Sequence, residues 1–149
     1  MVAVCMLSYI YFVTVNTLKI YFIFFSSEYV FSGLNGYYSE KSKTGNNLLY
    51  GTQKIKIEKF LKKQNYKNYS ILRLAKTYGD EINDKSIFMT FLKDYLNNKR
   101  NFIFADDQFF SALYVKDLVK IIDIFIKKKI PGIFNVCGNQ NYSRVEYLI

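Results

Sequence analysis

The residue pair in this chain with the clearest capacity for chemistry is Tyr50 and Lys54, which stand four positions apart. In a helix this spacing puts both side chains on one face. A lysine ammonium in that place favours the phenolate and lowers a phenol pKa that begins at about 10. A phenol poised in this way can exchange a proton with a ketone. The pair therefore predicts a carbonyl-reduction site.

The same spacing occurs twice more in the chain, so the pair alone is weak evidence. Tyr37 with Lys41 lies in a polar stretch, and Tyr95 with Lys99 lies at the end of a predicted helix. Short motifs built from abundant residues arise by chance, and this chain has 14 tyrosines. Neither of these two pairs follows a strand that ends in hydroxyl residues. The position of Tyr50 along the chain is what sets it apart.

A buried strand is predicted before the Tyr50 pair. Residues 20–25 form a run of aromatic and β-branched residues, which is typical of a strand inside a sheet, and Ser26 and Ser27 follow at its carboxyl end. Ligands of open α/β sheets bind at that edge. A polar loop over 32–47 then leads to a helix that opens with Leu48. This order favours a site shared between the end of the strand and the helix.

The helix after the loop is predicted to be amphipathic. Apolar side chains lie roughly on one side of it, while most of its lysines lie around the other. The apolar positions are Leu49, Ile55, Ile57, Phe60 and Leu61, and the lysines are Lys54, Lys56, Lys59, Lys62 and Lys63. An ordinary helix of this kind, with a solvent-facing Lys54 and with Ser27 as a strand-end cap, is the structural alternative to a catalytic site.

The rest of the chain continues an alternation of strands and helices, which predicts an α/β fold. We expect strands at 70–74, 102–104 and 133–136, helices at 84–97 and 115–128, and Ser143 as the N-cap of a further helix. Lysines 127–129 close the second of these helices, where cations suit the helix dipole.

Taken together, these residues resemble the extended short-chain dehydrogenase/reductases that act on nucleotide sugars, in the dTDP-4-dehydrorhamnose reductase-like branch. The resemblance rests on six segments in the family's order, over about residues 20 to 149. The segments are Ser26–Gly33, Tyr50–Lys54, Ile71–Leu74 with Tyr78-Gly79, Asp106–Gln108, Tyr114–Leu118 and Gly132–Gly138. Each match is weak alone, and their shared order carries the resemblance.

The resemblance implies a partial NAD(P)-binding Rossmann-like fold. Residues 20–149 would be the second half of its parallel sheet with a small substrate-binding region, and residues 1–19 would be an unassigned apolar segment. The first half of such a fold carries a Gly-rich phosphate turn. None of the seven glycines here forms one. We therefore expect an incomplete fragment of a longer enzyme, which by itself does not bind a dinucleotide tightly.

The resemblance also implies roles for individual residues in reducing a 4-keto nucleotide sugar. Tyr50 would protonate the C4 oxygen, and Lys54 would contact the nicotinamide ribose. Ser27 would hydrogen-bond the ketone, and Glu28, where the family has Asp, would assist proton delivery. Tyr50, Lys54 and Ser26 would contact the cofactor, NADP or NAD. The family's Gly-x-Pro-Thr is replaced here by residues 109–113, so the identity of the sugar does not carry over.

Two other functions in the same family stay open. A nucleotide-sugar epimerase or dehydratase uses the same Tyr and Lys, and product analysis would separate it from a reductase. A non-catalytic binding subunit is the second, because the branch is similar to the regulatory subunit of methionine adenosyltransferase. In that case Tyr50→Phe would leave function unchanged.

Composition adds expectations about partners and location. The net charge is +9, but the lysines are dispersed, which argues against nucleic acid as a partner. The apolar segment 2–25 approaches bilayer length, yet Asn16 and Lys19 interrupt it, so we do not expect a membrane anchor. Two distant cysteines and no histidine predict no metal site and fit a cytoplasmic protein. The expected partners are a nucleotide-sugar substrate and, as an open option, a second copy in a homodimer.

Overall fold

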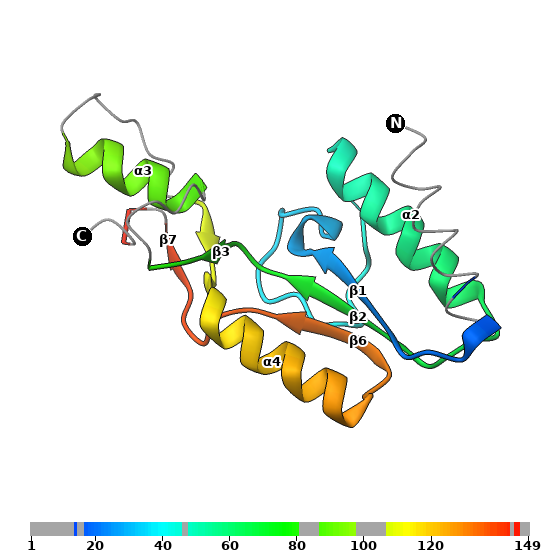
Figure 1. The fold of residues 1–149 in the computed structure, drawn as a ribbon. Coiled ribbons are helices and arrows are strands. Elements are labelled where there is room, and N and C mark those ends of the chain that lie inside the picture. The colour runs from blue at the N-terminus through cyan, green and yellow to red at the C-terminus, as the bar shows by residue number, and fades with distance from the viewer. Residues whose placement is uncertain are drawn as a thin grey trace. The chain divides into compact units, whose positions relative to one another are not determined.

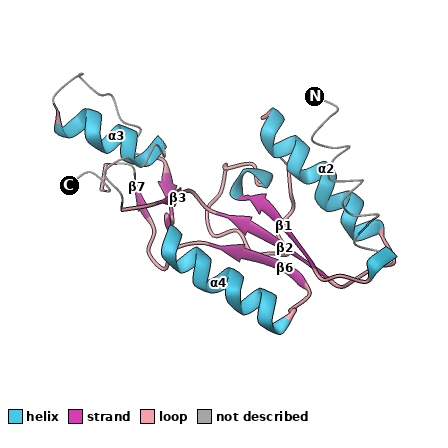
Figure 2. Ribbon diagram, viewed as in Figure 1, coloured by secondary structure: helices cyan, strands magenta, loops and turns pink. Residues whose placement is uncertain are grey.

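The structure is a computed structural model that describes residues 14, 17–45, 48–80, 87–97, 107–143 and 145–146. The chain divides into two compact units, and each is described by itself. The first unit comprises Met1–Leu74 with Ile121–Asn135, and the second comprises Ala75–Lys120 with Val136–Ile149. Figure 1 shows the elements in chain order, and Figure 2 distinguishes the helices from the strands.

The first unit is built on a sheet with the strand order β1-β2-β6. The strands are β1 (Phe22–Ser27), β2 (Tyr69–Leu74) and β6 (Gly132–Val136). Strands β1 and β2 are parallel, with Ser27 opposite Leu74, and all three arrows in Figure 1 point the same way. The α/β fold with a parallel sheet is thus confirmed. Strand β1 both begins and ends two residues later than predicted, so Ser26 and Ser27 are its last two residues rather than residues beyond it.

Helix α2 (Leu49–Lys63) is the crossover between the parallel strands β1 and β2. Its apolar side covers the sheet, where Ile57 and Leu61 pack with Phe24 and Ile71 in a buried cluster. Ile55 packs further along, against Val30 and Phe31. The exception is Leu49, which was expected on this side but is 58% exposed in the first turn. The amphipathic pattern therefore correctly identified the packed side of the helix, except in its first turn.

A short 3-10 helix, η1 (Glu28–Val30), follows β1 directly, and a loop then runs to α2. The loop is held to β6 at one point. The backbone N–H of Asn135 donates to Glu40 Oε1 at 2.9 Å, and the Asn135 side-chain amide donates to the Tyr38 carbonyl at 3.0 Å. This N–H lowers the pKa of the Glu40 carboxyl below its usual range. The loop is thus tied to the same sheet that bears β1.

The second unit contains two pairs of two-residue strands that the sequence pattern did not predict. Strands β3 (Thr77–Tyr78) and β5 (Leu113–Tyr114) are parallel, and β4 (Phe109–Phe110) and β7 (Tyr142–Ser143) are antiparallel. Such short segments give no periodicity to detect. Helix α3 (Ile87–Leu96) lies within the expected helix, whose residues 84–86 fall outside the described part, as does the expected strand at 102–104.

Ser143 makes the hydrogen bonds of a capping residue, and the helix that it was predicted to start falls outside the described residues. Its backbone N–H donates to Glu146 Oε2 at 2.6 Å, and its Oγ accepts from the backbone N–H of Glu146 at 3.2 Å. This reciprocal pair is a capping box, which satisfies two donors at the start of a helix. The residues from 147 onward lie outside the described part.

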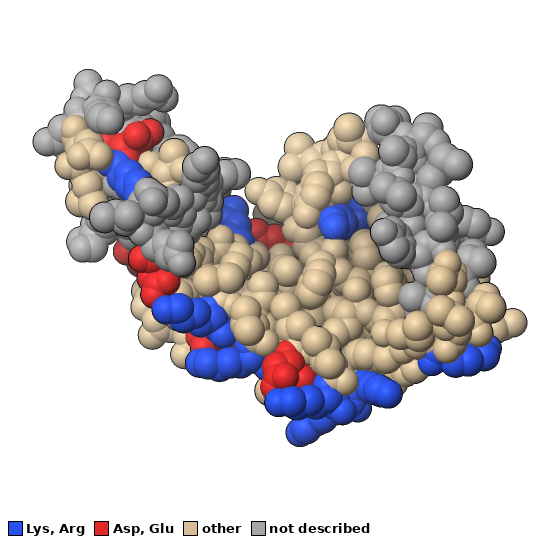
Figure 3. All heavy atoms as spheres, in the orientation of Figure 1, with Lys and Arg blue, Asp and Glu red and all other residues tan. Residues whose placement is uncertain are grey.

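Helix α4 (Val115–Lys128) begins and ends at the predicted residues. In the first unit, its Phe125 lies beside Phe134 of β6, with ring centres 4.9 Å apart. Its lysines are interspersed with acidic residues, as Figure 3 shows along this helix. Lys120 pairs with Asp117, and Lys127 pairs with Asp123. Within the described ranges, no helix is both long and apolar enough to cross a bilayer.

Candidate active site

The side chain of Lys54 turns toward the end of β1. Its Nζ donates a hydrogen bond to the carbonyl oxygen of Phe25 at 2.8 Å. The same nitrogen lies 5.1 Å from the centre of the Phe24 ring and 5.5 Å from that of Tyr50. Burial lowers the pKa of the Lys54 ammonium below its ordinary value. Lys54 is therefore not the solvent-facing lysine of an ordinary amphipathic helix.

Tyr50 lies one helical turn before Lys54 on α2, and its side chain is accessible. The residue is 51% exposed. Its ring lies edge-on to the ring of Tyr29, with centres 6.0 Å apart and an angle of 81° between the planes. This contact orients the Tyr50 ring without burying it. A ligand at the end of β1 could therefore reach this residue.

Ser27 and Glu28 continue the chain from this strand end. Ser27 is buried, and its Oγ accepts a hydrogen bond from the Tyr29 N–H at 3.3 Å, so it caps η1. Accepting this bond does not use the hydroxyl proton of Ser27, which remains able to donate. Glu28 is the first residue of η1 and is partly buried. Ser27 is thus the last residue of β1, and Glu28 is the first residue after it.

Ser26 is in a different position from the other predicted site residues. It is 3% exposed, and its Oγ donates to Glu58 Oε1 at 2.7 Å. Its hydroxyl proton is therefore committed to α2 rather than presented to a bound nucleotide. Arg73 of β2 completes this cluster, because its Nε and one terminal nitrogen donate to the two Glu58 oxygens at 2.9 and 2.7 Å. We call Ser26, Glu58 and Arg73 the buried polar cluster.

Sequence reasoning did not identify Glu58 or Arg73 as members of the site. A signal was present in both cases. Glu58 interrupts the apolar side of a helix between Ile57 and Leu61, and Arg73 lies in a strand whose neighbours are apolar. A charge in a predicted core position must be paired to be tolerated. Searching the sequence for two such charges of opposite sign would have proposed this pair.

The structure also separates the three Tyr/Lys pairs. Tyr37 is fully exposed and has a φ of 58° in the loop before α2, so it is not on a helix face with Lys41. Tyr95 is 43% exposed near the end of α3, and Lys99 lies outside the described residues. By contrast, Tyr50 and Lys54 share one helix, and the lysine lies near the tyrosine ring. Within the described residues, the pair favoured by its place in the sequence therefore has a defined environment on both of its side chains.

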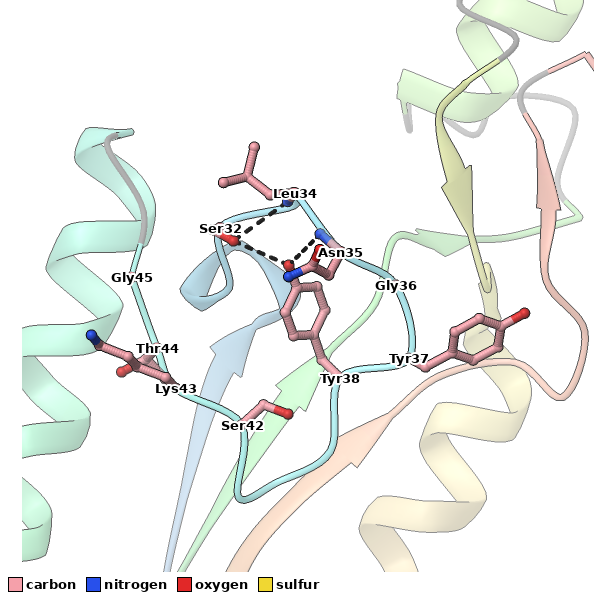
Figure 4. A pocket seen from close by; sticks show the side chains of 10 residues that line it. All are labelled: Ser32, Leu34, Asn35, Gly36, Tyr37, Tyr38, Ser42, Lys43, Thr44 and Gly45. Carbon is pink, nitrogen blue, oxygen red and sulfur yellow. Dashed lines mark hydrogen bonds between the residues drawn. The ribbon is translucent and has the colours of Figure 1, made fainter.

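The loop between η1 and α2 lines an open hollow of about 760 Å³. Figure 4 shows that Tyr38 points into the turn formed by Ser32 and Asn35, whereas Tyr37 points away. The Tyr38 hydroxyl contacts Ser32 Oγ at 3.1 Å and accepts from the Asn35 N–H at 3.0 Å. Both bonds lower the pKa of the Tyr38 phenol, and the bond with Ser32 has the larger effect. The hollow is rich in hydroxyl and amide groups, which suit a hydroxylated ligand.

The donors at this strand end fit one part of a nicotinamide dinucleotide. An ammonium has three hydrogens, and the Phe25 carbonyl accepts one of those of Lys54, which leaves two for the hydroxyls of a ribose. The pyrophosphate has no matching cradle, because the glycines of this chain do not form the turn that presents backbone N–H groups to phosphates. The residues therefore fit the nicotinamide end of a dinucleotide and not its phosphates.

Comparison with protein families gives one match that covers most of the chain. The model of the RmlD substrate binding domain matches residues 14–148. Among curated relatives, methionine adenosyltransferase 2 subunit beta of Rattus norvegicus is 28% identical over 133 residues, which is 85% of this chain and 39% of that protein. The same subunit of Xenopus tropicalis matches with the same identity and coverage. The chain thus spans about two fifths of the length of these relatives.

Solved structures confirm the fold class. The dTDP-4-dehydrorhamnose reductase of Bacillus anthracis in complex with NADP is 27% identical, with a TM-score of 0.74, and the match covers 89% of this chain and 46% of that one. A UDP-N-acetylglucosamine 4-epimerase of Methanobrevibacter ruminantium is 24% identical, with a TM-score of 0.78. This match covers 95% of the present chain and 49% of the epimerase. The second likeness shows the fold alone. The prediction of a partial Rossmann-like α/β fold is confirmed.

Proposed function

The chain belongs to the family of the RmlD substrate binding domain, and from that premise we propose that it carries the proton-transfer residues of an NAD(P)-dependent reductase of 4-keto nucleotide sugars. The observation that carries the proposal is the bond between Lys54 and the Phe25 carbonyl. It holds the lysine at the end of β1 while Tyr50, one turn away on the same helix, stays exposed. Ser27 ends the same strand.

In the proposed reaction each residue acts on the ketone or on the sugar of the cofactor. A nicotinamide cofactor, held through its ribose by Lys54, would supply a hydride to C4 of the sugar. Tyr50 donates its phenolic proton to the C4 oxygen, so that the C=O bond becomes an alcohol. Ser27 donates a hydrogen bond to the same oxygen, Lys54 binds the ribose hydroxyls, and Glu28 helps to return a proton to Tyr50. Acid catalysis of this kind contributes about a hundred- to ten-thousand-fold to the rate.

We propose further that the phosphates of the cofactor are bound by residues outside this sequence. The dTDP-4-dehydrorhamnose reductase of Bacillus anthracis is about twice as long as the part that this chain covers and is in complex with NADP. The polar hollow of the loop, near the start of α2 in the sequence, suits the hydroxyl groups of the sugar. A cytoplasmic location fits the two separate cysteines of this chain.

The test uses the whole chain with a dTDP-4-keto-6-deoxy sugar and either NADPH or NADH, and it follows the loss of nicotinamide absorbance. We expect Tyr50→Phe to lower any turnover by about a hundredfold or more. Tyr95→Phe is the matched control, because Tyr95 has the same spacing to a lysine but lies on α3 rather than on the helix of Lys54, and it should leave turnover unchanged. Measurable turnover of equal rate in Tyr50→Phe and the wild type would contradict the proposal.

A binding subunit is the second candidate, and the curated relatives favour it. Those relatives are named as subunit beta of methionine adenosyltransferase 2. If a protein that contains this chain together with a phosphate-binding half binds a nucleotide sugar in ligand-observed NMR but shows no turnover with either cofactor, this candidate replaces the reductase. Tyr50→Phe should then bind as tightly as the wild type. An epimerase or dehydratase, the third candidate, would convert the sugar without net consumption of the nicotinamide.

A further inference from the structure

We propose that the buried polar cluster of Ser26, Glu58 and Arg73 is a positioning device, which fixes the helix of Tyr50 and Lys54 against the end of β1. This inference rests on the proposed function for its catalytic consequence, but its structural content stands separately. Ser26 and Glu58 are then positioning residues rather than groups that touch the cofactor or the sugar.

The cluster is fully enclosed within the first unit. Glu58, Arg73 and Ser26 are 1%, 2% and 3% exposed. Arg73 binds both Glu58 oxygens, which is the two-point geometry that best fixes direction as well as distance. The Arg73 guanidinium also lies over the Phe31 ring, 5.0 Å from its centre, and one terminal nitrogen donates to the Glu40 carbonyl at 3.3 Å. The cluster thus joins β1, the segment after η1 and α2 to the central strand β2.

Two side-chain links connect α2 with neighbouring positions of β1. Lys54 donates to the carbonyl of Phe25, and the next residue of the strand, Ser26, donates to Glu58. On the helix, Glu58 lies one turn after Lys54, on the same face. The two links therefore run side by side and fix both the distance and the rotation of the helix relative to the strand. Apolar packing alone is not directional and fixes rotation less closely.

The desolvation cost of burying Glu58 and Arg73 suggests that their cluster has a role other than stabilising the fold. A buried ion pair contributes little net stability, because desolvation offsets the attraction of the charges. A reaction site, by contrast, gains from position, since a displacement of about 1 Å can cost about a hundredfold in rate. The cluster lies next to the residues for which position matters. This location is what assigns it a role in the site.

The first measurement tests position without any cofactor or substrate. Lysines of the whole chain are converted to ¹³C-dimethyl-lysine, and the pKa of Lys54 is followed by NMR. In the wild type, burial holds this pKa below its ordinary value. Ser26→Ala should raise it toward the ordinary value, because a loosened helix lets water reach the amine. The titratable neighbours, Tyr50 and Glu58 on α2 and Glu28 after β1, are unchanged in this variant.

Ser70→Ala is the matched control. Ser70 is a fully buried serine of the adjacent strand β2, but its hydroxyl contacts Tyr21 and the Ile130 carbonyl rather than α2. It should lower stability by an amount similar to Ser26→Ala while leaving the pKa of Lys54 unchanged. Ser26→Cys, close in volume but a weaker donor, should give an intermediate pKa. The inference would be overturned if Ser26→Ala left the pKa of Lys54 unchanged, or if both alanine variants changed that pKa equally.

The second measurement applies where the wild type reduces a nucleotide sugar. Ser26→Ala should then lower kcat by about ten- to a hundredfold while KM for the sugar stays the same. Ser70→Ala should change neither constant. A change in KM alone would show that Ser26 contributes to binding instead, which would contradict a positioning role. Because the NMR arm needs no turnover, it can fail or succeed independently of the proposed reaction.

Discussion

The Nζ atom of Lys54 lies 2.8 Å from the carbonyl oxygen of Phe25, a residue 29 positions earlier in the chain. The bond joins the first crossover helix to the strand that precedes it. It explains why a lysine in a helix with many exposed lysines is half-buried. The carbonyl accepts one hydrogen of the ammonium, and the remaining hydrogens can serve a ligand.

The first prediction concerns the pH dependence of stability. Burial lowers the pKa of folded Lys54 below that of the unfolded chain, which is about 10.4. At a pH below the pKa of folded Lys54, the amine is protonated in both the folded and the unfolded protein, and burial of this charge opposes folding. As the pH rises toward about 10.4, the folded protein loses this proton first, and stability increases. Denaturant midpoints should therefore rise with pH more steeply in the wild type than in Lys54→Met. Parallel curves would contradict the prediction.

The second prediction compares the contributions to stability of the two partners of Glu58, the buried Arg73 and the more exposed Lys62. Glu58→Gln leaves the Arg73 charge buried without its counterion, so we expect a loss of about 3–5 kcal/mol in the free energy of unfolding. Lys62 lies 3.8 Å from the same carboxylate, but its side chain is 45% exposed. Lys62→Ala should cost less than about 1 kcal/mol. Urea unfolding of both variants measures the difference, and similar losses would contradict it.

A related double variant tests whether the charge pair itself stabilises the fold. Replacing Glu58 by Leu together with Arg73 by Met removes both charges, so neither is left unpaired. We expect this protein to be closer in stability to the wild type than Glu58→Gln is. If the double variant is the less stable of the two, then the polar bonds of the cluster contribute more than their desolvation costs.

The third prediction concerns close backbone packing in the second unit. A Cβ atom on Gly138 would lie 2.2 Å from the Ala112 carbonyl oxygen. Backbone atoms cannot rotate away as the end of a side chain can, so Gly138→Ala should be strongly destabilising, by several kcal/mol. Gly36→Ala is the control, because a Cβ at Gly36 meets nothing within 4 Å. Thermal unfolding should show a much lower midpoint for Gly138→Ala than for Gly36→Ala.

The fourth prediction concerns the contact between the loop and β6. The Asn135 N–H lowers the pKa of Glu40, so the bond contributes stability above the unfolded pKa of about 4.3. That contribution is lost as the pH falls through the lower folded value. The amide proton resonance of Asn135 should therefore shift with pH in the acid range. In Glu40→Gln, which does not titrate, it should stay constant; a shift of the same size there would assign the titration to another group.

Local pattern was sufficient for the elements with strong periodicity. Helix α4 begins and ends at the predicted residues because its apolar positions, its terminal lysines and the following Pro131-Gly132 all agree. The two-residue strands β3, β4, β5 and β7 were beyond such reasoning, since pairing between distant segments defines them. A segment of two residues has no period to detect.

The sequence by itself determined the family, the α/β order of the elements and the shared helix face of Tyr50 and Lys54, because these depend on residue types and their spacing. The tertiary structure alone decided which groups Lys54 and Ser26 address. Lys54 bonds the Phe25 carbonyl, and Ser26 donates to Glu58 rather than facing a ligand. Hydrogen bonds need atoms within about 3.5 Å and a suitable angle. Spacing along one helix cannot supply that geometry when the partner belongs to a strand far away in the sequence.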